Sequence, residues 1–244
     1  AKGIIVIAAA GNVWPFVVYP ARYPEVLCVA ATNVDRVRWS RSAQGRPVAV
    51  CAPGENVHRA TFENGQATVS PSSGTSYATA VVAGIAALWL SKHGRENLIR
   101  DYGAGNVSKL FRWVVMNRGV RRDDSWDTRN LGAGIIDAKM VLEAELPEPG
   151  TFALSFDVMP RSRFEEIADY FPEVPEEELR ARLMAMLNTT EAQLESDLER
   201  YGNELKLHMA MDDSMRARMS GTPALSFDAP MMPMSRSLMA KMTG

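Results

Sequence analysis

The sequence predicts an α/β fold with a three-layer arrangement and a mostly parallel sheet, followed by a small α-helical C-terminal extension. Two observations lead to this class. Continuous apolar runs rich in β-branched residues lie at 3–10, 26–32 and 48–52, a pattern typical of strands buried on both faces. A long apolar helix is expected after them, and strands followed by helices favour a layered α/β domain.

The remaining elements of this domain follow in order. Asn64-Gly65 between the short apolar runs 61–62 and 67–69 predicts a hairpin. The helix expected at 76–92 is apolar nearly all round, so we expect it to run through the core. Further helices are expected at 106–117 and 136–145.

A break in composition divides the chain near Pro147-Glu148-Pro149-Gly150. Residues 1–150 carry a net charge of +4, whereas residues 151–244 carry −6. We therefore expect three parts: a layered domain over 1–147, an acidic helical extension over 148–221, and a poorly ordered tail rich in Met, Pro and Ser over 222–244. The opposite charges favour intramolecular docking of the extension.

Bulk properties exclude several classes of function. A net charge of −2 gives no nucleic-acid signature, and without a run of about 18 apolar residues we expect no membrane span. Cys28 and Cys51 lie in apolar strand-like runs and are expected to be reduced core thiols. A short repeat, residues 151–157 and 222–228, is either a local duplication or a pair of docking motifs.

The chemistry is concentrated at two places. Ser76 follows Gly74-Thr75 where the long helix begins, and a helix N-terminus favours the negative charge that a serine nucleophile generates. Asn12 follows a strand and Gly11, so its amide lies at the carboxyl end of a parallel sheet, where ligands bind. Taken singly, each residue is more simply a helix cap or a turn residue, and their joint occurrence in this order favours a catalytic site.

Over residues 3–145 the chain resembles the subtilisin-like serine peptidases. Four segments carry the likeness, and Gly132–Ala138 is a weaker fifth. They are Ala8–Asn12, the Tyr-Pro-x-x-Tyr-Pro stretch Tyr19–Pro24, the turn Ala52-Pro53-Gly54, and the nucleophile segment Ser73–Gly84. The resemblance implies a partial subtilisin-like domain that hydrolyses peptide bonds in peptide or protein substrates, in a secreted or cell-envelope protein.

The resemblance also implies roles for single residues. Ser76 would form an acyl-enzyme, while Asn12 and the Ser76 backbone N–H would hold the oxyanion. Ala10, Gly11, Val18 and Thr75 would border the substrate. Members of the family often bind calcium, but the chain has no Asp-x-Asp-x-Asp-Gly loop, so we assign no metal and no other cofactor.

Two departures from the family pattern stand out. Ala80 and Val81 replace the usual Pro-His after the nucleophile, and none of the three histidines matches the catalytic one. We therefore expect the C-terminal part of a catalytic domain, with the catalytic Asp and His upstream and little cleavage by this chain alone. The alternative is a catalytically inactive scaffold that binds peptides or a partner. An α/β-hydrolase is disfavoured because the Gly-x-Ser-x-Gly elbow is missing.

Overall fold

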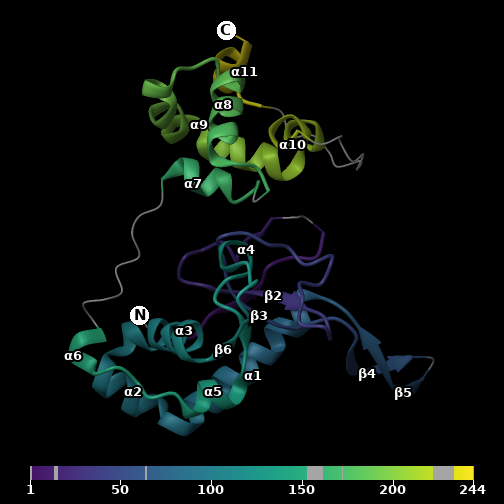
Figure 1. Ribbon diagram of the computed structural model, residues 1–244, viewed down its shortest axis with the longest axis vertical. Helices are drawn as coiled ribbons and strands as arrows, with labels where there is room; N and C mark the ends of the chain where they lie inside the picture. Colours follow the sequence, from purple (N-terminus) through teal and green to yellow (C-terminus); the bar gives the residue numbers. More distant parts are fainter. Residues whose placement is uncertain are drawn as a thin grey trace. The chain divides into compact units, whose positions relative to one another are not determined.

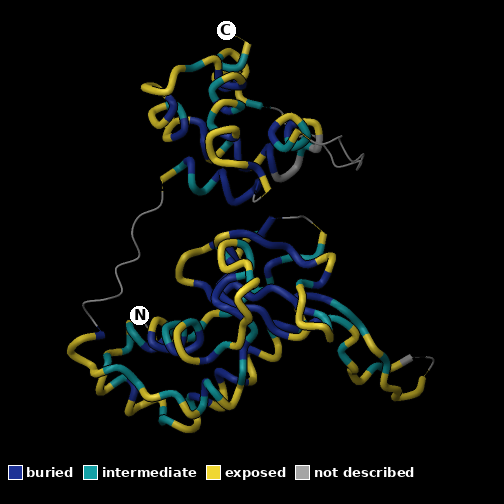
Figure 2. The backbone as a smooth tube through the Cα atoms, viewed as in Figure 1, coloured by how far each residue is buried: buried dark blue, intermediate teal, exposed yellow. Residues whose placement is uncertain are grey.

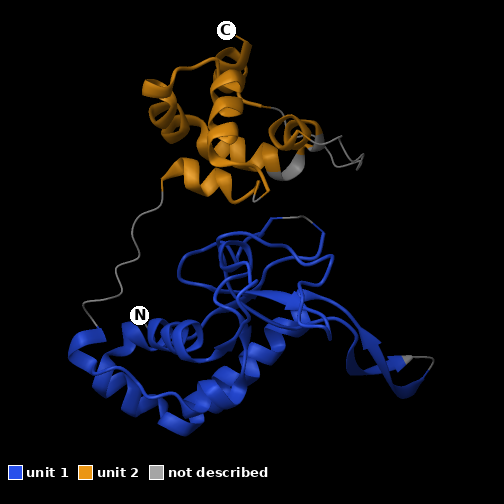
Figure 3. Ribbon diagram, viewed as in Figure 1, with its two compact units in different colours: residues 1–158 blue, residues 159–244 orange. Residues whose placement is uncertain are grey.

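The computed structural model describes residues 2–13, 16–63, 65–152, 162–171, 173–221 and 234–243. The chain forms two compact units, residues 1–158 and residues 159–244 (Figure 3). The division falls later than the boundary after residue 147 that composition suggests. The reason is Phe152, which is buried against the ring of Tyr102 in the first unit, while the Tyr102 hydroxyl donates to the Pro147 carbonyl.

The first unit is built on a five-stranded sheet in the order β1-β2-β3-β7-β6 (Figure 1). Its strands are β1 (Ile7–Ala9), β2 (Leu27–Thr32), β3 (Val48–Pro53), β6 (Val120–Arg121) and β7 (Ile135–Ile136). The pairs β1–β2, β2–β3 and β3–β7 are parallel, and only β6 runs antiparallel to its neighbour. The predicted α/β class with a mostly parallel sheet is therefore confirmed.

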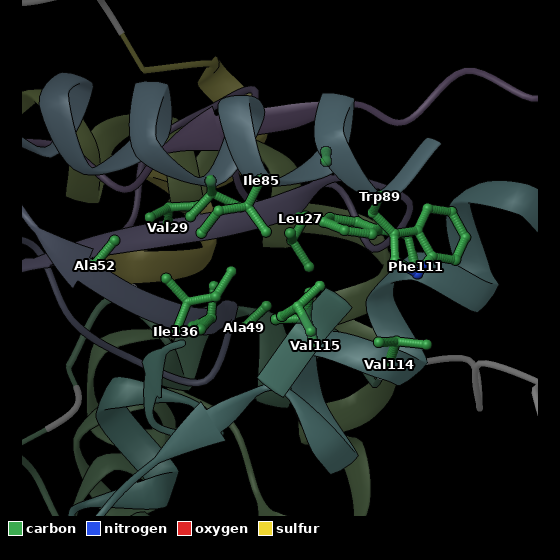
Figure 4. Packing of buried hydrophobic residues seen from close by; sticks show 14 of the residues in the cluster. Leu27, Val29, Ala49, Ala52, Ile85, Trp89, Phe111, Val114, Val115 and Ile136 are labelled. Atoms are coloured by element: carbon green, nitrogen blue, oxygen red, sulfur yellow. The ribbon is translucent and has the colours of Figure 1, made fainter. Parts of the chain in front are cut away.

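Helices cover one face of this sheet. The helices of the unit are α1 (Thr75–His93), α2 (Arg95–Tyr102), α3 (Val107–Arg118), α4 (Thr128–Leu131), α5 (Ala138–Glu143) and α6 (Pro149–Phe152), with a 3₁₀ turn at Ala104–Asn106. Alternate residues of β2, such as Leu27 and Val29, pack with Ile85 and Trp89 of α1 and Phe111 of α3 (Figure 4). The opposite face, with Cys28 and Cys51, is covered by loops and α4, and both thiols are free and buried.

The long helix does not run through the core as its composition suggests. Its buried residues, including Ala78, Val82 and Trp89, follow one side only. On the other side lies a stripe of exposed residues that we call the α1 stripe: Ser76, Ala80, Ala83, Gly84, Ala87 and Leu88 (Figure 2). The helix is apolar on both sides because most residues of the α1 stripe are small and apolar. Among the described residues, no element covers the stripe.

The predicted hairpin is present and longer than expected. Strands β4 (Val57–Glu63) and β5 (Gln66–Ser72) pair antiparallel and form a sheet of their own, which projects from the unit (Figure 1). The second strand ends just before α1 begins. The hairpin therefore leads the chain directly into the segment that contains Ser76.

The second unit is helical. It contains α7 (Arg163–Ala168), α8 (Glu176–Met186), α9 (Glu191–Met211), α10 (Asp213–Ser220) and α11 (Arg236–Thr243). Leu179 and Leu183 of α8 and Leu194, Leu198 and Leu205 of α9 are fully buried, whereas Leu207 of α9 is exposed. Of the tail that we expected to be poorly ordered, residues 222–233 and the repeat at 222–228 lie outside the described residues, as does most of the repeat at 151–157. Residues 236–243 instead form α11, whose Leu238 is buried.

Candidate active site

Glycines bring the end of β3 against the start of α1. The Gly54 carbonyl, just after β3, accepts a hydrogen bond from the Gly74 backbone N–H at 2.7 Å. A Cβ at Gly54 would lie 2.6 Å from the Ala31 Cβ and 2.8 Å from the Gly74 oxygen, distances that no side chain tolerates. The Ala-Pro-Gly turn thus fixes the entry to α1, a function of Gly54 that sequence reasoning recognised only as part of a motif.

Asn12, after β1, reaches the same helix end from the other side. Its Oδ1 atom accepts hydrogen bonds from the Thr75 backbone N–H at 2.8 Å and from the Thr75 hydroxyl at 2.7 Å. A backbone N–H can only donate, so the amide oxygen must face Thr75. The Asn12 Nδ2 donor consequently points away from Thr75, and a Cβ at Gly74 would lie 3.4 Å from it.

Ser76 is exposed in the first turn of α1. The N–H of Thr75 donates to Asn12, and the N–H of Tyr77 donates to the Gly74 carbonyl. Among the described residues, no hydrogen bond engages the Ser76 N–H or hydroxyl. The first turn therefore offers one free backbone donor, next to a free hydroxyl and at the positive end of the helix dipole.

The other residues predicted for the site lie close to Asn12 and Ser76. Val18 donates its backbone N–H to the Ala10 carbonyl at 3.1 Å, and Gly11 donates its N–H to the Thr75 hydroxyl at 3.2 Å. Gly11 has φ +122°, a conformation that disfavours other residues. Ala10 and Thr75 are fully buried, so Thr75 acts on the site through its bonds to Asn12 and Gly11.

No histidine accompanies Ser76. His93 ends α1, about 25 Å along the helix axis from Ser76, and burial together with Lys92 lowers its pKa. His58 lies on β4 opposite Pro71, and His208 belongs to the second unit. Across the described ranges, no hydrogen bond joins a histidine to Ser76. Among the described residues, the candidate nucleophile Ser76 thus has no histidine as a hydrogen-bond partner.

Within the described residues, no three His, Cys, Asp or Glu side chains are grouped in a way that could hold a metal ion. None of the helices in the described ranges combines the length and the apolar character that a membrane span requires.

Comparison with known proteins identifies the first unit. Residues 1–120 match the family model described as the subtilase family, Peptidase_S8. Subtilisin E of Bacillus subtilis (strain 168) is 44% identical over 97 residues, which are 38% of this chain and 25% of subtilisin E. A thermostable alkaline protease of Halalkalibacterium halodurans is 42% identical over 92 residues, covering 37% of this chain and 25% of that protein.

The alignments thus span only about a quarter to a third of the curated relatives they match. Among solved structures, the patellamide maturation protease PatA is similar with a TM-score of 0.46 and 27% identity, over 57% of this chain and 50% of PatA. The MycP1 structure with its N-terminal propeptide removed has a TM-score of 0.47 and 25% identity, over 61% of this chain and 53% of that one.

Proposed function

We propose that residues 1–120, which match the subtilase family model, carry the nucleophile of a serine-type endopeptidase. The observation that carries the proposal is the pair of hydrogen bonds from Thr75 to the Asn12 Oδ1 atom. These bonds join segments 63 residues apart and direct the remaining Asn12 donor away from Thr75. The proposed substrates are peptides or proteins.

In the proposed reaction, the Ser76 hydroxyl oxygen attacks the carbonyl carbon of the scissile bond while a base removes the hydroxyl proton. The oxygen of the tetrahedral intermediate carries the negative charge and accepts hydrogen bonds from Asn12 Nδ2 and the Ser76 N–H. The C–N bond then breaks, the leaving amine takes the proton, and an acyl-enzyme remains on Ser76. Water attacks this ester by the same sequence and releases the acid.

We propose that the catalytic Asp and His come from a segment outside residues 1–244, which is expected upstream. The distribution of the histidines supports this, since the described residues pair none with Ser76. The α1 stripe supports it too. Ser76 begins a line of exposed small apolar residues, so a segment that covers this line also arrives beside the nucleophile.

One observation favours the alternative of an inactive scaffold that binds peptides or a partner. Ser76 lacks a base within the described residues, and a serine hydroxyl is a weak nucleophile without one. The two hypotheses differ in whether a supplied base restores chemistry at Ser76.

Chemical rescue tests the proposal on the chain as it stands. We expect a fluorophosphonate to label Ser76 slowly, because loss of the histidine lowers the turnover of subtilisin itself about 10⁶-fold. Added imidazole should accelerate the labelling, and mass spectrometry should find the adduct on Ser76 alone. The Ser76→Ala variant is the control and should stay unlabelled. Rapid labelling without imidazole would contradict the external base, and no response to imidazole would favour the scaffold.

Two weaker expectations remain proposals of the same kind. A secreted or cell-envelope location follows from the family resemblance, and fractionation of the source cells tests it. Docking of the acidic extension follows from the opposite net charges of the two parts. Removal of residues 159–244, which leaves the buried Phe152 in the first unit, should then lower the melting temperature of that unit, and an unchanged melting temperature would exclude this docking.

A further inference from the structure

A cavity of about 470 Å³ lies in the first unit and shares no residue with the Ser76 site. It is lined by Arg36, Arg121, Arg122, Asp123, Trp126, Ile135, Ile136 and Asp137. The residues come from the turn after β2, the β6–β7 pair and the segment before α4. A volume of this size falls in the range of small-molecule sites, which is about 300–1,000 Å³.

The carboxylates of the cavity are already engaged. Asp137 caps α5 by accepting the Met140 N–H and pairs with the Arg121 guanidinium. Both interactions hold the pKa of Asp137 below its usual range. The Asp123 carboxylate accepts the Ser125 hydroxyl at 2.7 Å and the Ser125 N–H at 3.0 Å. Within the described residues, neither acid forms an ion pair with Arg36 or Arg122.

Two of the three guanidinium groups, those of Arg36 and Arg122, form no ion pair within the described residues. Arg122 uses Nη1 to donate to the Ala133 carbonyl at 2.9 Å, and its other donors have no acceptor among the described residues. The Arg36 side chain has no hydrogen bond or ion pair there at all. Its backbone has φ +64°, which for a residue other than glycine is uncommon and holds the side chain on a constrained turn.

The rest of the lining is apolar. Ile136 is buried and Ile135 half-buried. The Trp126 Nε1–H donates to the Gly132 carbonyl at 3.0 Å, so the indole presents only its apolar surface to a ligand. Polar recognition in this cavity therefore depends on the two arginines.

From this arrangement we propose that the cavity is a second binding site, which takes a small molecule with an apolar body and one oxyanion. Guanidinium groups bind carboxylates and phosphates through the same paired donors, so the shared chemistry is an oxyanion on an alkyl or aryl group. The site acts independently of Ser76, and its failure would leave the proposed peptidase function untouched.

Titration of the ¹⁵N-labelled chain tests this site, with the Trp126 indole N–H signal as the reporter and Trp126→Phe to assign it. The probes are hexanoate, hexyl phosphate, hexanol and inorganic phosphate. We expect saturable shifts with hexanoate, hexyl phosphate or both, and at least fivefold weaker binding of hexanol and of inorganic phosphate, a ratio of about 1 kcal/mol. Comparing the first two probes identifies the preferred oxyanion.

Variants distinguish binding in the cavity from general electrostatic attraction of the probe to the protein. Arg36→Gln and Arg122→Gln should each weaken binding of the preferred probe about fivefold, near the upper limit for exposed charge pairs. Arg59→Gln removes the same charge from the exposed hairpin strand β4 and should change binding less than about twofold. Equal effects of all three variants, hexanol binding as tight as hexanoate, or no saturable shift would each overturn the proposal.

Discussion

The two longest helices of the chain show how differently its two units use apolar surface. In α9, Leu194, Leu198 and Leu205 are fully buried on one side of the helix, and Leu207 is exposed. In α1 the apolar residues surround the helix, yet Leu88 on the α1 stripe is 56% exposed. Most large apolar side chains of α9 are thus buried within their own unit, whereas α1 presents an exposed apolar face. Ser76, the proposed nucleophile, lies at the start of that face.

Matched truncations give the largest difference between the two helices. Leu198→Ala should destabilise the second unit by about 2–5 kcal/mol, because it opens a cavity in a closed core. Leu88→Ala should change the stability of the first unit by less than about 0.5 kcal/mol, as for other exposed positions. Urea unfolding followed by residue-resolved hydrogen exchange measures both. A large effect of Leu88→Ala in the isolated chain would mean that the α1 stripe is covered.

A smaller loss of stability is expected when the hydrogen bonds that link Thr75 to Asn12 and Gly11 are removed from the first unit. Thr75→Val keeps the shape of the side chain but removes the hydroxyl bonds to Asn12 and Gly11, at a cost of about 1–3 kcal/mol. Thr79→Val on the same helix removes only a bond to the Thr75 carbonyl and is the control. Thermal unfolding compares the two variants. Equal melting temperatures would show that the Thr75 hydroxyl does not fix Asn12.

Acid pH should affect the second unit through Glu166. Burial raises the pKa of this carboxyl, but the hydrogen bonds from Lys206 and Arg163 outweigh it and the pKa is lowered from 4.5. A carboxyl with a lowered pKa in the folded state stabilises the fold above its unfolded pKa, and this contribution is lost as the pH falls through the folded value. The stability of the second unit should therefore drop as the pH falls below about 4.5.

Glu166→Gln is the variant that checks this pH dependence. It should flatten the slope of unfolding free energy against pH without removing it, because Asp197 and Asp212 also have lowered pKa values. Urea titrations at several pH values measure the slope. A slope as steep as that of the unchanged chain would assign the effect to other carboxyls.

The smallest effect concerns the α1 stripe itself. Leu88→Glu should leave unfolding nearly unchanged, because the side chain already faces solvent. It should lower binding of an apolar dye such as ANS, since the charge interrupts the apolar line. Leu142 of α5 is half-buried in the core, so Leu142→Glu is a destabilising contrast. Unchanged dye binding in Leu88→Glu would place the accessible apolar surface elsewhere.

The sequence predicted best where one physical signal dominates. The β-branched run at 26–32 and the small-residue helix after Ser76 indicated β2, α1 and the class of the sheet. It missed α2, in which only Leu98 is buried and charges dominate, so no apolar stripe marks it. It also assigned α1 to the core, because composition records how apolar a helix is and not which side a neighbour covers.

The candidate site was likewise predictable only where a local signal in the sequence marks it. Placing Asn12 and Ser76 at one edge needed only strand ends and a helix start, and the structure has both around Thr75. The 470 Å³ cavity was not foreseen, because Arg36 and Arg122 lie 86 residues apart and meet only where the turn after β2 and the β6–β7 pair line the same cavity. Spacing along the chain carries no signal for such a site.

The central claim is that Asn12 donates to an oxyanion formed at Ser76. Asn12→Asp tests it most directly, because the aspartate keeps an oxygen that accepts from Thr75 and replaces the Nδ2 donor with a second, negatively charged carboxylate oxygen. In imidazole-rescued phosphonylation of Ser76, we predict a rate about 10²–10³ lower than that of the unchanged chain, the magnitude established for subtilisin itself. Equal rates at an equal melting temperature would contradict the account.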